Sequence, residues 1–289
     1  MSHGPADGPV PARPPVPPRA DENFPVALRV LPAATRRHLL ALYGYARHVD
    51  DLGDEPPPSA SGTDVIAALD RFEHELWAVY AGAPARHPVI AALAPTIAAC
   101  RLPVDPLVRL VEANRVDQIV SRYPTFDQLV AYCRLSANPV GELVLHVFGC
   151  ATPERLELSD RICTALQVVE HLQDVAEDLH RGRIYLPKED LDRFGVPESD
   201  LGGATASPRL RELLAFESQR ARAWLDAGAP LVSTLRGFAR LAVSGYVAGG
   251  RAALRALDRA GYDPLPGPPK AGRRDVLVQL LAATVRGPG

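Results

Sequence analysis

Two groups of acidic residues have the spacing that places carboxylates together on one face of a helix. In one group, Glu170, Asp174 and Asp178 recur every four residues, so a continuous helix carries them as a single stripe. Stacked carboxylates repel one another and destabilise a helix unless a cation lies among them. The stripe therefore indicates a cation site.

The other group lies upstream, where Tyr43, Arg47, Asp50 and Asp54 follow one another at spacings of four, three and four residues. This spacing again places the side chains on one helix face. Either group alone is typical of a solvated helix end. Two such groups on separate apolar helices, both beside arginine and tyrosine, instead predict carboxylates that face each other at one end of a helical bundle.

The candidate ligands in both groups are oxygen atoms without nearby thiolates, a set that suits Mg²⁺. Mg²⁺ typically takes one or two protein carboxylates and completes its shell with water and a substrate phosphate. Arg47, Arg181 and Arg183 are candidates for charge-assisted contacts to phosphate oxygens. These residues predict ionisation of a carbon–diphosphate bond, in which metal stabilises the leaving group and the protein shields a carbocation.

Other reaction classes lack their motifs in this chain. The sequence contains no HExxH, GxGxxG, GxxxxGK or GxSxG motif, which gives no support to a zinc peptidase, a dinucleotide or P-loop enzyme, or a serine hydrolase. A di-iron helical bundle would require a pair of ExxH motifs, which is also missing.

The apolar pattern predicts an all-α fold, because apolar residues recur at helical spacing and no segment alternates with period two. Pro139 interrupts one predicted helix, and the sequence allows two roles for the resulting kink, which either borders a ligand channel or only lets two helices approach. Asp105 and Ser159 are the expected N-caps of two helices. The segment 181–195 is expected to be a non-helical hinge. The predicted helices are about 33–55, 64–80, 88–100, 106–121, 126–149, 159–180, 208–227 and 231–260, followed by a short terminal helix.

Length and composition favour one large soluble domain. The chain has 289 residues, of which 47% are hydrophobic, so it can bury a sizeable core. Its 32 basic and 34 acidic residues are interspersed, which argues against a nucleic-acid partner. Four separate cysteines and the lack of a long apolar run favour a reduced, cytoplasmic protein.

We expect residues 1–20 to be a disordered proline-rich tail, with a proline-rich ligand segment as the alternative, and residues 21–289 to form the domain.

Four ordered motifs resemble those of squalene and phytoene synthases. They are ENFPVA at 22–27, YARHVDDLGDE at 45–55, YCRLSANPVGELVLHVFG at 132–149 and LQVVEHLQDVAEDLHRGRIYLP at 166–187. Within that family the ENFPVA, SANPVG and LQDVAEDL segments resemble the bacterial branch of squalene synthases called HpnC, or hydroxysqualene synthases.

The resemblance implies a single-domain isoprenoid-synthase helical bundle with a central cavity and Mg²⁺ at the two acidic motifs. It also implies a reaction of squalene and hopanoid biosynthesis, in which presqualene diphosphate loses diphosphate and water captures the rearranged cation as hydroxysqualene. The implied metal ligands are Asp50, Asp54, Asp174 and Asp178, which with Tyr132 form the catalytic set. The implied substrate contacts are Phe24, Tyr43, Arg47, Asn138, Gly141, Gln167, Glu170, Arg183 and Tyr246.

The chain departs from the condensing members of that family at two positions. They usually carry Asn where this chain has Glu170 and Arg where it has Gln173. Both changes make the site more negative, and we interpret them as suited to one diphosphate at a time. The alternatives left open are head-to-head condensation of two prenyl diphosphates and, in a different class, a non-catalytic helical assembly partner. The expected partners are a prenyl-type diphosphate and a downstream hydroxysqualene-reducing enzyme, and peripheral contact with the inner face of the membrane is left open.

Overall fold

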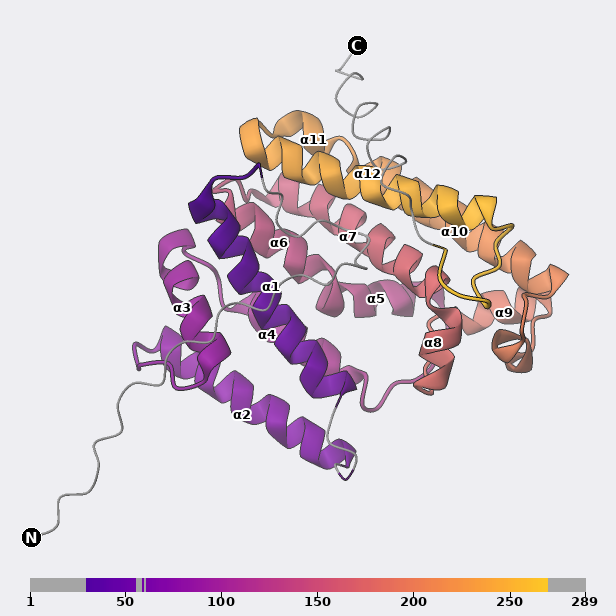
Figure 1. Cartoon of the computed structure of the whole chain (residues 1–289), viewed down its shortest axis with the longest axis horizontal. Coiled ribbons are helices and arrows are strands. Elements are labelled where there is room, and N and C mark those ends of the chain that lie inside the picture. Colours follow the sequence, from indigo (N-terminus) through magenta and orange to yellow (C-terminus); the bar gives the residue numbers. More distant parts are fainter. Residues whose placement is uncertain (1–29, 56–58, 60, 270–289) are drawn as a thin grey trace, which may run out of the picture.

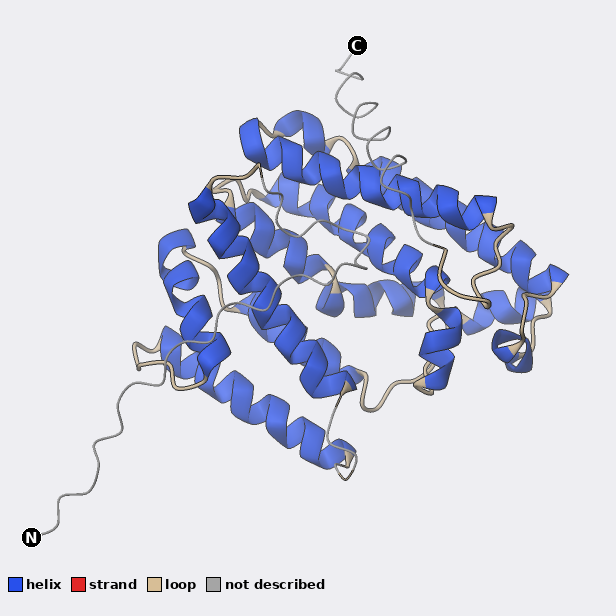
Figure 2. Ribbon diagram, viewed as in Figure 1, coloured by secondary structure: helices blue, strands red, loops and turns tan. Residues whose placement is uncertain are grey.

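The computed structural model describes residues 30–55, 59 and 61–269, and these form a bundle of helices (Figures 1 and 2). No strand occurs among them, and a single parallel bridge joins Arg122 and Ile184. The all-α prediction is therefore confirmed. The helices are α1 (Ala33–Asp54), α2 (Gly62–Tyr80), α3 (Pro88–Cys100), α4 (Asp105–Val116), α5 (Phe126–Ser136), α6 (Asn138–Val147), α7 (Pro153–Gln173), α8 (Val175–His180), α9 (Lys188–Phe194), the 3₁₀ turn η1 (Glu198–Gly202), α10 (Pro208–Gly228), α11 (Leu231–Thr234) and α12 (Gly237–Arg259).

Several predictions concern residues outside the described ranges. They are the proline-rich tail 1–20, the substrate contact Phe24 and the short terminal helix after residue 270. Within the described part of the chain, no helix combines the length and the apolar character needed to cross a bilayer.

Capping side chains and prolines explain where many of the helices begin. Ser61 and Asp64 form a reciprocal capping box at the start of α2. The hydroxyls of Thr125, Thr152 and Ser207 accept hydrogen bonds from backbone N–H groups in the first turns of α5, α7 and α10. Each of these caps satisfies a donor that the helix itself leaves without a partner.

Both predicted N-caps are wrong. Asp105 is the first residue of α4 and pairs with Arg109 at 2.8 Å instead of capping the helix. Thr152 caps α7, which begins before the predicted start, and Ser159 is buried within that helix. The periodic apolar pattern does not distinguish a capping hydroxyl from one that packs inside a helix.

Several predicted boundaries also differ from the structure, including that of the helix 106–121, which ends at Val116. The segment 126–149 is two helices that meet at Ala137. Pro139 lies in the first turn of α6, where its missing N–H costs no hydrogen bond, whereas in a helix interior it would. The segment 231–260 divides into α11 and α12, and the predicted hinge 181–195 contains α9. The acidic stripe is also interrupted, because Asp174 adopts φ −105° and ψ 18° between α7 and α8.

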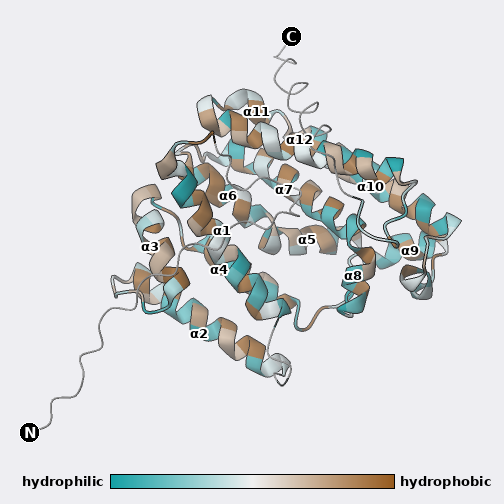
Figure 3. Cartoon of the chain, in the orientation of Figure 1, coloured by the Kyte–Doolittle hydropathy of each residue, from teal (hydrophilic) through white to brown (hydrophobic). Residues whose placement is uncertain are grey.

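Two large apolar cores lie on either side of the bundle, and a small third cluster consists of Leu31, Leu39 and Val144. One joins α1–α4 with Leu143, and the larger one joins α5, α7, α10 and α12 with the segments that follow them. Figure 3 shows that each helix carries apolar and polar residues together, as a helix between a core and water requires. The two large cores meet along α6, which contributes Leu143 to one and Leu145 to the other, and the space left between them positions the candidate site.

The packing of α7 against α10 depends on a close approach at Gly228. A Cβ at this position would lie 2.7 Å from the carbonyl oxygen of Leu158 and 3.0 Å from the backbone nitrogen of Ile162. Both contacts are with backbone, which cannot rotate away as a side chain can. Gly245 on α12 is buried, but a Cβ there would meet no atom within 4 Å.

We expect Gly228→Ala to lower the free energy of unfolding by about 1–3 kcal/mol, since the two helices must separate. The matched variant Gly245→Ala should instead be neutral or raise it by up to about 1 kcal/mol, because alanine is the better helix former. Urea denaturation followed by far-UV circular dichroism measures both. Equal effects of the two substitutions would contradict the proposed close approach.

A buried acidic pair lies between α9 and α10. The Arg220 guanidinium donates to Asp190 Oδ2 at 2.8 Å and to Glu217 Oε1 at 3.0 Å, and both acids are nearly inaccessible to solvent. Burial raises the pKa of Glu217 to about 8; a hydrogen bond with Asp190 adds to the rise and Arg220 opposes it. The folded protein therefore holds the Glu217 proton at pH values where the unfolded chain has released it, above about pH 4.3.

The pKa of Glu217 is higher in the folded protein than in the unfolded chain. The stabilisation that protonated Glu217 provides is therefore complete at low pH and is lost as the pH rises towards 8. We expect the free energy of unfolding of the wild type to fall between pH 5.5 and 8 relative to that of Glu217→Gln, by up to about 1.4 kcal/mol per pH unit. Urea titrations of both proteins across this range measure the difference. Parallel pH profiles would contradict the assignment.

Candidate active site

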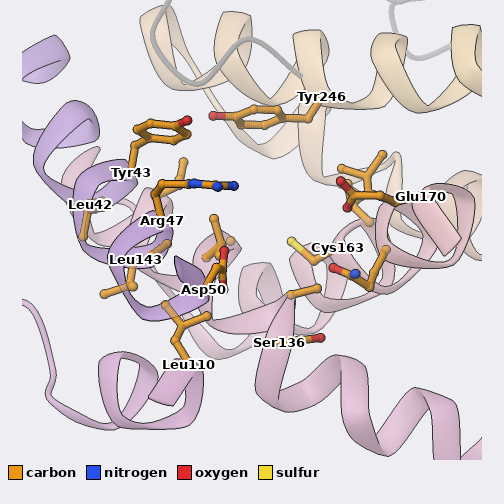
Figure 4. A pocket seen from close by; sticks show the side chains of 18 of the residues that line it. Leu42, Tyr43, Arg47, Asp50, Leu110, Ser136, Leu143, Cys163, Glu170 and Tyr246 are labelled. Atoms are coloured by element: carbon orange, nitrogen blue, oxygen red, sulfur yellow. The ribbon is translucent and has the colours of Figure 1, made fainter. Parts of the chain in front are cut away.

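A cavity of about 560 Å³ lies where the two cores meet. This volume is typical of small-molecule sites, which are roughly 300–1,000 Å³. Figure 4 shows Tyr43 and Tyr246 with their hydroxyls pointing towards one another, Arg47 and Asp50 on one side, and Glu170 on the other. Much of the remaining wall is apolar, and it is contributed by Leu39, Leu42, Leu110, Leu143, Val144, Ile162, Leu166, Leu231 and Val243.

The structure brings nine of the predicted site residues to this cavity. The side facing α1 carries Asp50, and the side facing α7 carries Glu170. Both side chains are exposed to the cavity space, although protein surrounds them closely. The nine are Tyr43, Arg47, Asp50, Gly141, Gln167, Glu170, Asp174, Arg181 and Tyr246.

The acids of the cavity weaken one another's ionisation. Burial raises the pKa of Asp50 to about 6, with Asp54 adding to the rise and a hydrogen bond from Asn114 opposing it. Burial raises the pKa of Glu170 to about 7, and the charges of Asp174 and Asp50 add to it while His171 opposes it. Asp50 and Glu170 therefore act on each other from different helices, as the two facing motifs predicted.

The arginines near the cavity are paired with acids in this structure. Arg47 contacts Asp51 at 2.6 Å and Glu55 at 3.2 Å. Asp54 does not line the cavity and is instead held by Arg183 at 2.6 Å and by the more exposed Arg181 at 3.4 Å. These ion pairs join the first acidic motif on α1 to the segment that follows the second motif.

The interruption at Asp174 separates the acids of the second motif. Asp174 lines the main cavity beside Glu170, whereas Asp178 borders a small second cavity with His171 and Tyr185. Burial raises the pKa of Asp174 to about 6, and the nearby charge of Asp178 adds to the rise. The expectation of one straight acidic stripe is therefore wrong, because the backbone leaves helical geometry at its middle residue.

Tyr132 and Asn138 lie behind the cavity wall. Tyr132 is buried among Tyr123, Tyr185 and His171, and it does not line the cavity as the resemblance implied. Asn138 is also buried, and its amide oxygen accepts a hydrogen bond from Thr164 at 3.1 Å. Both residues are therefore placed to support the site from behind in this conformation.

Gly141, in the SANPVG segment, both borders the cavity and lets two helices approach closely, which are the two roles that the sequence allowed for this segment. It lines the cavity, and a Cβ at this position would collide with Ser159 Oγ and Cys163 Sγ on α7. The missing side chain thus allows α6 to approach α7 closely where the two cores meet. Ala137 and Val140 from the same segment also line the cavity.

Sequence reasoning missed the polar face of α4 and its C-terminal end. Asn114 donates to Asp50 Oδ1 at 3.2 Å, and Gln118 donates to the carbonyl of Gly53 at 3.2 Å. Asp117 accepts hydrogen bonds from two tyrosines. Asn114 lies in α4, and Asp117 and Gln118 follow in the turn that ends it, three and four residues further on. Three polar side chains at helical spacing at the end of an apolar segment are a signal that could have been noticed.

Gly53 explains why Asn114 can reach the first motif. A Cβ at Gly53 would collide with the Asn114 side chain. A larger residue in the middle of DDLGDE would therefore push away the amide that holds Asp50.

The residues around the cavity fit a hard divalent cation. Asp50 and Asp174 supply oxygen ligands next to a cavity whose acids have raised pKa values, and a cation would relieve their repulsion. No group of three or more acids, histidines or cysteines among the described residues is close enough together to hold a metal by itself. A cation held here would complete its shell with ligands from outside the protein, such as water or phosphate, as is common for Mg²⁺.

Comparison with known proteins identifies the family. The sequence profile described as squalene/phytoene synthase matches residues 17–280. Hydroxysqualene synthase from Rhodopseudomonas palustris is 34% identical over 219 residues, which cover 75% of this chain and 73% of that protein. Phytoene synthase from Arthrospira platensis is 35% identical over 214 residues, which cover 70% of this chain and 68% of that protein.

Among solved structures, squalene synthase HpnC from Alicyclobacillus acidocaldarius is 45% identical, with a TM-score of 0.75 over 81% of this chain and 87% of that one. A dehydrosqualene synthase at 23% identity has the same fold, with a TM-score of 0.79. With its helical fold, its apolar cavity and its two acidic motifs, the chain belongs to the squalene/phytoene synthase family.

Proposed function

We propose that this protein converts presqualene diphosphate to hydroxysqualene, with release of diphosphate, in squalene and hopanoid biosynthesis. Enzymes of its family act on prenyl diphosphates and use a divalent metal to bind the diphosphate. The observation that carries the proposal is a cavity with a largely apolar wall that is also lined by Asp50, Glu170 and Asp174. The 45% identity to the squalene synthase HpnC supports the finer assignment.

In this proposal Asp50, Asp54, Asp174 and Asp178 hold Mg²⁺, which supplies charge that stabilises the departing diphosphate. Arg47 and Arg183 would turn from their acidic partners to phosphate oxygens. The apolar side chains of α1, α6 and α7 would hold the prenyl chains and keep bulk water from the carbocation. Tyr43 and Tyr246 would present aromatic rings and hydroxyls near the reacting carbon.

Glu170 and Gln173 favour a substrate with one diphosphate. Glu170 places a third acid in the cavity, and the side-chain amide of Gln173 donates to the carbonyl of Pro269, so part of it is engaged by the protein itself. A site with more negative charge and one fewer cation would hold two diphosphates less well than one. The second candidate function is condensation of two prenyl diphosphates. The name phytoene synthase implies this reaction for other relatives.

Purified protein with Mg²⁺ should consume presqualene diphosphate and release hydroxysqualene, whereas farnesyl diphosphate should be left largely unchanged. Gas chromatography with mass spectrometry identifies the products, and a coupled phosphate assay measures diphosphate release. Rapid formation of presqualene diphosphate from farnesyl diphosphate would show a condensing enzyme instead. A protein that turns over neither substrate but is stabilised by Mg²⁺ and pyrophosphate would be a non-catalytic relative.

Asp174→Asn should lower turnover of presqualene diphosphate by about a thousandfold or more, since the variant removes a charged metal ligand from the transition state. The thermal midpoint without metal should stay the same or rise, because Asp174 lies among repelling acids. Steady-state kinetics and a thermal scan measure the two quantities. A variant with full activity and an unchanged Mg²⁺ response would count against the metal assignment.

A further inference from the structure

The segment that follows α12 turns back towards the main cavity. We call residues 263–269, which read DPLPGPP, the strap. Asp263 begins the strap, and its Oδ1 accepts hydrogen bonds from the backbone N–H of Ala206 at 2.9 Å and from that of Leu265 at 3.3 Å. Arg211 pairs with its other carboxylate oxygen, and Leu265 is buried in the larger core. The base of the strap is therefore fixed to the loop before α10.

The tip of the strap reaches the cavity beside the end of α7. The N–H of Gly267 donates to the carbonyl of Pro264 at 3.0 Å, and Gly267 has a φ of +148°, which glycine adopts without strain. Beyond this turn Pro268 lines the cavity, and the side-chain amide of Gln173 donates to the carbonyl of Pro269. In Figure 1 the yellow segment after α12 returns towards α8.

The strap needs a hydrogen-bond donor from elsewhere at its tip. Four of its seven residues are proline, and proline has no backbone N–H to donate. The carbonyl of the half-buried Pro269 is partly withdrawn from water, so a donor from the protein is favourable there. Proline also lowers the conformational entropy that the segment loses when it is held in place. A single hydrogen bond from Gln173 therefore has a large effect on the position of the strap.

Pro268 lies at the rim of the cavity. It lines the cavity and is also an exposed residue, and the same holds for Glu177 and Arg181. Residues around a mouth have these two properties together. Gln173 and Asp174 line the cavity as well, so the strap borders the side of the cavity that carries the second acidic motif.

An uncharged donor suits the position of Gln173. Glu170 and Asp174 are three residues and one residue away in the sequence and line the same cavity. A cationic side chain at this place would be drawn to these acids in competition with the strap carbonyl. The amide of Gln173 has no net charge, and the acids therefore compete less for it.

We propose that Gln173 is a positioning residue that holds the strap at the mouth of the cavity and thereby narrows the mouth. When this hydrogen bond breaks, the strap moves about its fixed base and the mouth widens. The benefit rests on the proposed function, in which a carbocation must be kept from bulk water while diphosphate and an apolar product later leave. The hydrogen bond and the narrowing themselves do not rest on it.

A native thiol can report access to the cavity. Cys163 lines the cavity and is partly exposed, whereas Cys100, which is also partly exposed, lies on α3 and does not line it (Figure 4). Peptide mass spectrometry measures the rate at which pyrenyl maleimide, a bulky apolar reagent, labels each thiol. The quantity of interest is the rate at Cys163 divided by the rate at Cys100. Methyl methanethiosulfonate, a small reagent, gives the same ratio without a demand for a wide mouth.

Gln173→Met keeps the length of the side chain and removes the donor. We expect the ratio for pyrenyl maleimide to rise about three- to tenfold, which is the loss of one neutral hydrogen bond expressed as a population of open molecules. The ratio for methyl methanethiosulfonate should stay within about twofold of the wild type. Gln128→Met is the matched control, because it makes the same chemical change at an exposed position of α5 outside the cavity. It should leave both ratios unchanged.

Pro268→Gly supplies a second variant should Gln173→Met fail to fold. It leaves Gln173 in place, removes a ring from the rim and loosens the exposed tip of the strap, so the ratio for pyrenyl maleimide should rise here too. An unchanged ratio in folded Gln173→Met, or in Pro268→Gly where the first variant does not fold, would overturn the proposal. An equal rise with both reagents would also overturn it, because it would show local unfolding and not a wider mouth.

The labelling experiment uses neither substrate nor metal, so its outcome is separate from that of the proposed function. A protein that does not turn over presqualene diphosphate would overturn the proposed function and leave the role of Gln173 at the mouth to be decided by the labelling ratios.

Discussion

Burial of several carboxylates around one largely apolar cavity is the constraint on which the rest of the site depends. Asp50, Glu170 and Asp174 line the cavity from α1 and from the α7–α8 junction. Burial raises their pKa values, and the charges of neighbouring acids add to the rise. Such an arrangement costs stability in a metal-free protein. The large apolar cores on both sides of the cavity supply the stability that allows it to persist.

Ion pairs relieve part of this repulsion in the structure. Arg183 and Arg181 hold Asp54, and Arg47 is held between Asp51 and Glu55. Substrate and metal would have to exchange these internal partners for phosphate oxygens and Mg²⁺. The ion pairs of the arginines are thus contacts that a ligand could replace. The hydrogen bonds of Asp117 and Asn114 would stay and keep the surrounding side chains in position.

The break at Asp174 gives the second motif two different environments. Asp174 and Glu170 face the main cavity, whereas Asp178 lies with His171 next to Tyr185. A straight helix would have placed all three acids in one row, where each would repel its neighbours equally. The interruption instead spreads the acids around the place that diphosphate is proposed to occupy.

The sequence by itself determined the helical fold class, most helix positions and the two acidic motifs, because periodic apolar spacing and carboxylate spacing are local properties. It did not reveal that Tyr132 lies behind the wall or that the acidic stripe bends at Asp174. Those features follow from long-range contacts, such as the hydrogen bond from Tyr132 to Asp117 and the tie between Ile184 and Ser121. Only the tertiary structure decided which polar side chains of α4 meet the acidic motifs, since segments far apart in the sequence must first pack before their charges can act on each other.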